Sequence, residues 1–120
     1  MRRLTLLWVG RPAAAAIEAV ARDYVQRLRR FVGFDEIRVR PAPGRADAAR
    51  ARASEAAALR RHLAPGDLVI FLDERAAVPT TRELAARLEA GLRRARVVLV
   101  VGSDLGLDEE LVAEGETLSL

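Results

Sequence analysis

Glycine stands near both ends of the segment Gly102-Ser103-Asp104-Leu105-Gly106-Leu107, which follows an apolar run and precedes a short acidic stretch. Glycines in a turn between a strand and a helix let backbone amides approach a ligand that side chains would otherwise block. The spacing is not the dinucleotide fingerprint Gly-x-Gly-x-x-Gly, nor a P-loop, which would also need a lysine that this chain lacks. The segment therefore indicates either a ligand-binding loop or a tight turn that needs glycine only for its backbone angles.

Charged side chains, Asp73, Glu74 and Arg75, close a second apolar run at residues 67–73. Paired carboxylates could transfer a proton or bind a metal ion, but acids beside an arginine at the end of a strand are more often solvated or ion-paired. The chain has no cysteine and one histidine, so we expect no metal site and no thiolate nucleophile. No catalytic residue is assigned from the sequence.

Arginine supplies all 20 basic residues, and its distribution favours a polyanionic partner. The formal charge is only +3, but six of the 17 acids lie within residues 100–120, where there is no arginine. Residues 1–99 therefore hold 20 arginines and 11 acids, a balance of +9. Such asymmetry is typical of nucleic-acid-binding proteins, although a genome that favours arginine codons would give the same count. The candidate phosphate contacts are Arg2, Arg3, Arg11 and Arg45.

Alternating strands and helices must position these groups within one domain, residues 1–120. Strands are expected at residues 4–9, 34–40, 67–73, 97–101 and 117–120, and helices at residues 13–30, 47–63, 80–94 and 108–114. The runs 67–73 and 97–101 are typical of central strands covered on both faces, whereas residues 34–40 alternate as a half-buried or edge strand does. This order predicts an α/β fold with a mostly parallel sheet and flanking helices.

Two of the helices carry further signals. Apolar side chains recur at helical spacing within residues 13–30, which predicts a stripe packed against the sheet: Ile17, Val20, Ala21, Tyr24, Val25 and Leu28. Thr80 and Glu83 form a capping-box pattern at the start of the third helix. Acid–arginine pairs four residues apart are expected along that helix, Glu83 with Arg87 and Glu89 with Arg93.

Several stretches resemble the bacterial large-subunit ribosomal RNA (pseudouridine-N3)-methyltransferases of the SPOUT superfamily. They are the glycine loop, Leu72-Asp73 before it, Leu118-Ser119-Leu120 after it, the opening strand Leu6-Leu7-Trp8-Val9-Gly10, and residues 24–31 and 80–85. The resemblance implies a SPOUT-like α/β knot fold and a homodimer that uses S-adenosyl-L-methionine to methylate N3 of a pseudouridine in 23S rRNA. The rRNA would be part of the large subunit or the 70S ribosome. Cofactor contacts are implied at Leu72, Gly102, Gly106 and Leu120.

Two departures from that family bear on activity. The family shows Gly-Gly-x-x-Gly with an acid before the last glycine, whereas Ser103 and Leu105 stand at these positions here. Family members also continue past the position of Leu120, so the domain is expected to be C-terminally incomplete. It would lack the knot-closing segment and groups that orient and deprotonate the substrate, and would expose an apolar patch.

Three hypotheses about function follow. The chain is a methyltransferase of this family, a non-catalytic RNA- or ribosome-binding module derived from it, or an unrelated small α/β domain. No apolar run approaches the roughly 20 residues that a membrane helix needs, so we expect a cytoplasmic protein without a membrane segment.

Overall fold

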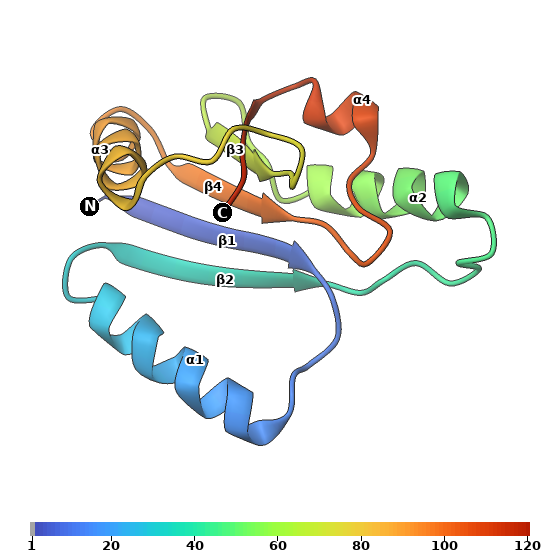
Figure 1. The fold of residues 1–120 in the computed structure, drawn as a ribbon, viewed down its shortest axis with the longest axis horizontal. Coiled ribbons are helices and arrows are strands. Elements are labelled where there is room, and N and C mark those ends of the chain that lie inside the picture. The colour runs from blue at the N-terminus through green and yellow to red at the C-terminus, as the bar shows by residue number, and fades with distance from the viewer. Residues whose placement is uncertain (1) are drawn as a thin grey trace.

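Five strands form one parallel sheet in the computed structural model, which describes residues 2–120 (Figure 1). They are β1 (Arg3–Val9), β2 (Gly33–Val39), β3 (Leu68–Leu72), β4 (Val97–Val101) and β5 (Glu116–Leu118), in the spatial order β2-β1-β4-β3-β5. Every pair of neighbouring strands runs parallel. The predicted α/β fold with a parallel sheet is confirmed, as are the edge position of β2 and the interior positions of β3 and β4.

The helices divide between the two faces of the sheet. One face is covered by α2 (Ala48–Arg60) and α4 (Glu109–Val112), and the other is approached by α1 (Ala15–Leu28) and α3 (Thr81–Leu92). Under α2 and α4 the apolar side chains are almost completely excluded from water, as at Leu7, Phe71 and Leu111. This face forms the main core. None of the helices within residues 2–120 is long and apolar enough to cross a membrane.

The predicted packing of the first helix is wrong over most of its length. Helix α1 has no buried residue, and Ile17, Val20 and Tyr24 are 63%, 58% and 63% exposed. Only Val25 and Leu28, near its C-terminal end, pack against the sheet. Figure 1 shows the helix diverging from β1 and β2 towards its start. Helical periodicity identifies a face that needs covering, but it does not say which surface covers it.

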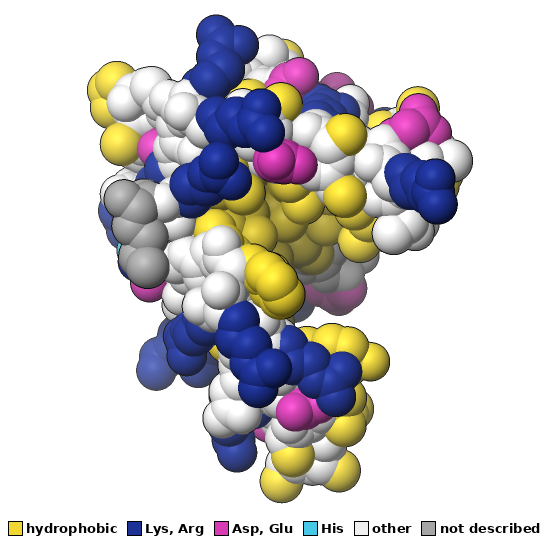
Figure 2. Space-filling model, turned by 90° about the vertical axis from the view of Figure 1, so that its left-hand side faces the viewer, with side chains coloured by type: hydrophobic (Ala, Val, Ile, Leu, Met, Phe, Trp, Pro, Cys, Tyr) yellow, Lys and Arg dark blue, Asp and Glu magenta, His cyan; other side chains and the backbone are white. Residues whose placement is uncertain are grey.

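An apolar hollow lies between α1 and the rest of the body (Figure 2). The face of the sheet towards α1 and α3 keeps several leucines only partly buried, among them Leu6, Leu72 and Leu99. Phe31, at the end of the first helical segment, is largely exposed. A parallel sheet is normally buried on both faces, so packing another apolar surface against this face would be favourable.

The start of α3 has the predicted capping box. The Thr80 hydroxyl accepts a hydrogen bond from the Glu83 amide at 3.1 Å, and the Glu83 carboxylate accepts one from the Thr80 amide at 3.1 Å. Because that carboxylate turns back to the cap, Arg87 pairs with Glu116 of β5 instead of Glu83. The Glu89–Arg93 pair forms as predicted, at 2.8 Å.

A largely buried ion pair fastens the sheet at its amino edge. Asp67, whose side chain is 7% exposed, accepts hydrogen bonds from Arg96 Nε at 3.1 Å, Arg96 Nη2 at 2.6 Å and the Ala64 amide at 2.8 Å. Arg96 Nη2 also donates to the His62 carbonyl at 2.8 Å. The guanidinium of Arg96, the largest contributor, holds the pKa of Asp67 below its ordinary value of 3.8.

We expect Asp67→Asn to lower the free energy of unfolding by about 2 kcal/mol at neutral pH, because it removes the charge from several hydrogen bonds. A depressed carboxyl pKa stabilises the fold above the unfolded-state value of 3.8, and that contribution is lost as pH falls through the folded-state pKa. Urea unfolding at pH 7 and near pH 3 therefore tests the assignment. The difference between the wild type and the variant should be smaller near pH 3 than at pH 7, whereas a pH-independent difference would contradict the assignment.

Candidate functional site

A pocket of about 590 Å³ lies at the carboxyl edge of the sheet, where β3 and β4 end. In open α/β sheets this edge is where ligands bind. Leu72, Gly102 and Gly106, three of the four cofactor contacts implied by the family resemblance, line this pocket together. Leu120, the fourth, does not belong to its lining and is largely exposed after β5. Two segments that are distant in the sequence therefore meet at one cavity.

The glycine loop, residues 102–107, is folded into a tight turn that forms one wall of the pocket. The Gly106 amide donates to the Ser103 carbonyl at 2.9 Å, and Gly106 has a positive φ of +81°. A Cβ atom on Gly102 would lie 2.9 Å from both the Gly106 carbonyl carbon and the Leu107 Cγ. The turn thus needs glycine at both positions, and a loop closed in this way can still present its backbone to a ligand.

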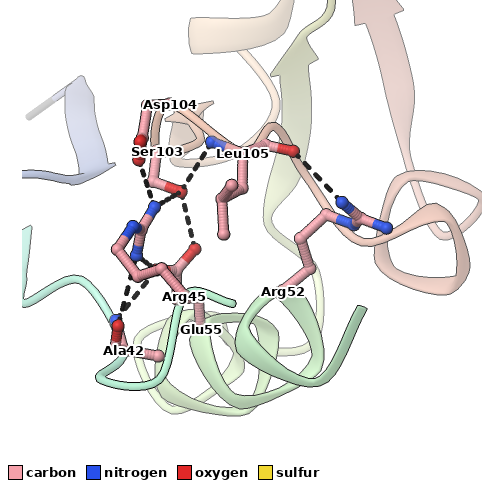
Figure 3. Close-up of polar contacts among 7 residues, drawn as sticks. All are labelled: Ala42, Arg45, Arg52, Glu55, Ser103, Asp104 and Leu105. Atoms are coloured by element: carbon pink, nitrogen blue, oxygen red, sulfur yellow. Dashed lines mark hydrogen bonds and ion pairs between the residues drawn. The ribbon is translucent and has the colours of Figure 1, made fainter. Parts of the chain in front are cut away.

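A buried carboxylate holds this loop from the side of α2 (Figure 3). Glu55, only 3% exposed, accepts hydrogen bonds from the Ser103 hydroxyl at 2.8 Å, the Ala42 amide at 2.9 Å and Arg45 Nη1 at 2.9 Å. Glu55 therefore connects α2 to the segment after β2 and to the glycine loop. Three donors compensate the charge for its removal from water.

Arg45 completes the same network. Its guanidinium donates to the Ser103 hydroxyl at 3.0 Å, to the Asp104 carboxylate and to the Ala42 carbonyl at 3.2 Å. The carboxylates of Glu55, which has the largest effect, and Asp104 raise the pKa of Arg45 above its ordinary value, so Arg45 stays positively charged. We call Arg45, Glu55 and Ser103 the loop clamp.

The mouth of the pocket carries charged side chains of both signs, with acids in excess. Four acids and two arginines line it: Asp73, Glu74, Asp104 and Glu109, with Arg52 and Arg75. Arg75 bonds both oxygens of Asp73 at 3.2 Å and thereby holds the pKa of that carboxyl below its ordinary range. The ion-paired interpretation of Asp73 is confirmed, and a carboxylate held in this way is a weak base. The excess of acids suits a ligand with a positive charge.

The four candidate RNA contacts do not form one surface. Arg11 follows β1 at the carboxyl edge, and Arg45 lies beside the glycine loop at the same edge. Arg2 and Arg3 lie at the opposite edge, where β1 begins, and Arg3 is ion-paired with Asp35 of β2. Of the four, Arg45 contacts the lining of the pocket, through Ser103 and Asp104.

Sequence analysis missed two residues of the site, Glu55 and Arg52. Glu55 shares the buried face of α2 with Ala51, Ala56 and Leu59, so a lone acid on an apolar helix face was the available signal. Arg52 lines the pocket and donates to the Leu105 carbonyl at 3.5 Å. Nothing in its local sequence distinguishes it from the other helical arginines. Within residues 2–120, no group of three His, Asp or Glu side chains is arranged to hold a metal ion.

A family profile and several relatives match this chain over nearly its whole length, and their names agree. Residues 2–120 match the sequence profile of a family described as predicted SPOUT methyltransferases. The Ribosomal RNA large subunit methyltransferase H of Anaeromyxobacter sp. (strain Fw109-5) is 37% identical over 120 residues, which cover 98% of this chain and 78% of the relative. The protein of that name from Pelobacter propionicus is 33% identical over 122 residues, with coverages of 98% and 78%. Its counterpart from Nitratidesulfovibrio vulgaris is 34% identical over 114 residues, with coverages of 93% and 74%.

Proposed function

Because this chain belongs to the SPOUT methyltransferase family, we propose that it transfers a methyl group from S-adenosylmethionine to N3 of a pseudouridine in 23S rRNA. The pocket at the ends of β3 and β4 carries the proposal, since the glycine loop that resembles this family forms its wall. The rRNA substrate is inferred from the relatives, which are named as methyltransferases of large-subunit ribosomal RNA. The position N3 is inferred from the resemblance of the loop and the neighbouring strands.

The pocket fits S-adenosylmethionine in size and in chemistry. Its volume of about 590 Å³ lies within the range of small-molecule sites. Leu72, Val101 and Leu107 offer apolar walls for an adenosine, and Gly102 and Gly106 bring the loop backbone within reach. The excess of acids suits the ammonium and sulfonium charges. When bound, the cofactor supplies an electrophilic methyl group on its sulfonium sulfur. We propose Leu72, Gly102 and Gly106 of the lining as its contacts, with Leu120, which lies outside the lining, as a fourth.

The basic residues at the carboxyl edge are proposed to receive the RNA, in the large subunit or the 70S ribosome. Arg11 follows β1 at this edge and is exposed, so its guanidinium is free to approach a phosphate. Arg45 is partly exposed beside the pocket, although its hydrogen bonds tie it to the loop clamp. Arg2 and Arg3 would contact RNA only on a separate surface at the opposite edge. The site of action would be the cytoplasm, where ribosomes are found.

Three measurements test this function. Calorimetry should detect S-adenosylmethionine binding, and radiolabelled methyl should pass to large subunits or 70S ribosomes that lack the modification. Nuclease digestion and mass spectrometry of the product should place the label on N3 of a pseudouridine. Salt-sensitive ribosome binding without cofactor affinity would contradict the enzyme and favour the RNA-binding module. Methylation at another nucleotide would contradict the proposed position.

A second copy of this chain is proposed to cover the exposed stripe of α1. We expect sedimentation velocity to show a homodimer, and the triple variant Ile17→Gln, Val20→Gln, Tyr24→Gln to raise its dissociation constant at least about 100-fold. The reason is that three side chains that are more than half exposed would lose their apolar contacts. Glu18→Gln with Arg22→Gln, on the same helix, is the matched control and should leave the dimer intact. A wild-type monomer, or a triple variant that dimerises normally, would contradict the proposal.

A further inference from the structure

We infer that Glu55 and Arg45 are positioning residues that set the shape of the cofactor loop through the hydroxyl of Ser103. The assignment rests on the proposed function, because it gives the glycine loop a cofactor to hold. Neither Glu55 nor Arg45 lines the pocket, whereas Ser103, Asp104 and Leu105 do. The two charged residues therefore act on a ligand through the loop and not by touching it.

The Ser103 hydroxyl is the point at which the loop is attached. It donates its one hydrogen to Glu55 Oε1 at 2.8 Å and accepts hydrogen bonds from Arg45 Nη2 at 3.0 Å and from the Leu105 amide at 3.3 Å. These contacts fix the hydroxyl both to the helix behind it and to the loop backbone ahead of it. A glycine or an alanine at this position would leave the loop without that attachment.

The carboxylate of Glu55 is itself held firmly. Its Oε2 accepts from the Ala42 amide and from Arg45 Nη1, both at 2.9 Å, which leaves Oε1 directed at Ser103. Because Glu55 is buried, water does not readily replace a lost partner, so each hydrogen bond constrains the others. A loop fixed before the ligand arrives loses less conformational entropy on binding. Glu55 and Arg45 therefore increase affinity without contributing a ligand contact of their own.

The test compares S-adenosylmethionine affinity among single and double variants by calorimetry. We expect Ser103→Ala and Glu55→Gln each to weaken binding about tenfold. The first removes the hydroxyl that attaches the loop, and the second replaces one of the two acceptor oxygens of the carboxylate with a donor. The double variant should bind at most about twofold more weakly than the more affected single variant, because both changes act through one hydrogen-bond network.

Asp67→Asn is the matched control. It alters another largely buried carboxylate paired with an arginine, but at the opposite edge of the sheet. We expect it to leave the affinity within about twofold of the wild type, even though it lowers stability. Wild-type affinity in Ser103→Ala and Glu55→Gln, or an equal loss in Asp67→Asn, would overturn the inference.

Hydrogen exchange of the loop amides separates failure of this inference from failure of the proposed function. If the wild type does not bind S-adenosylmethionine, the proposed function fails. Faster exchange across residues 102–107 in Ser103→Ala and Glu55→Gln, but not in Asp67→Asn, would still support a loop held by Glu55 and Arg45. Exchange that is unchanged in those two variants would overturn it whatever the cofactor result.

Discussion

Replacing Gly102 with alanine is expected to weaken S-adenosylmethionine binding at least about 100-fold. The new Cβ would lie 2.9 Å from the Gly106 carbonyl carbon and 3.0 Å from its oxygen. Because these are backbone atoms on the far side of the same turn, no side-chain rotation relieves the overlap. The turn must open, and the wall of the pocket moves with it.

The effect of Gly102→Ala on affinity, measured by calorimetry, must be separated from the effect of any glycine-to-alanine change, so two control variants are needed. Gly106 and Gly66 both have positive φ, +81° and +89°, and a Cβ on either would meet nothing within 4 Å. Alanine at either position should cost about 1 kcal/mol of stability, since only the backbone angle opposes it. Gly66→Ala, far from the pocket, should leave the affinity unchanged, and Gly106→Ala should weaken it less than Gly102→Ala. Equal affinities for all three variants would refute the steric explanation.

Phe71→Ala is expected to lower the free energy of unfolding by about 3–5 kcal/mol, because it empties part of the main core. Phe71 is 1% exposed on β3, and its ring lies close to Gly115, where a Cβ would be 2.8 Å from Cε2. The ring is therefore closely packed, and its removal leaves a cavity in the core.

Phe31→Ala is the matched control for Phe71→Ala. It removes the same side chain from a position that is 84% exposed, so the change in stability should be under about 0.5 kcal/mol. Urea denaturation at equilibrium measures both variants. A small loss in Phe71→Ala would mean that the core collapses around the vacancy, whereas a large loss in Phe31→Ala would mean that Phe31 is covered in solution, as in a dimer.

Much of the fold could be predicted because its signals are local. The apolar runs of β3 and β4, the alternation in β2 and the Thr80–Glu83 cap each occupy a few consecutive residues. The approach of Leu72 to Gly102 was also predictable, since the carboxyl ends of parallel strands meet at one edge of a sheet.

The rest could not be predicted because it depends on which segments meet in space. The apolar stripe of α1 has the periodicity of a packed helix, yet Ile17 and Val20 do not pack against the sheet and remain exposed. Arg45 looked like one phosphate contact among many arginines, and only the folded chain brings it between Glu55 and Asp104. Arg87 was expected to pair with Glu83 on its own helix but forms an ion pair with Glu116 on β5.

The span of the Glu55–Ser103 hydrogen bond has a consequence for the order in which the molecule is assembled. The two residues are 48 positions apart, and β3, α3 and β4 lie between them. Contacts of such long sequence separation require closure of a large loop, so they tend to form late. The glycine loop can therefore take its final shape only after α2 has docked on the sheet. A nascent or partly folded chain would already contain every residue of the pocket and still have no cofactor site.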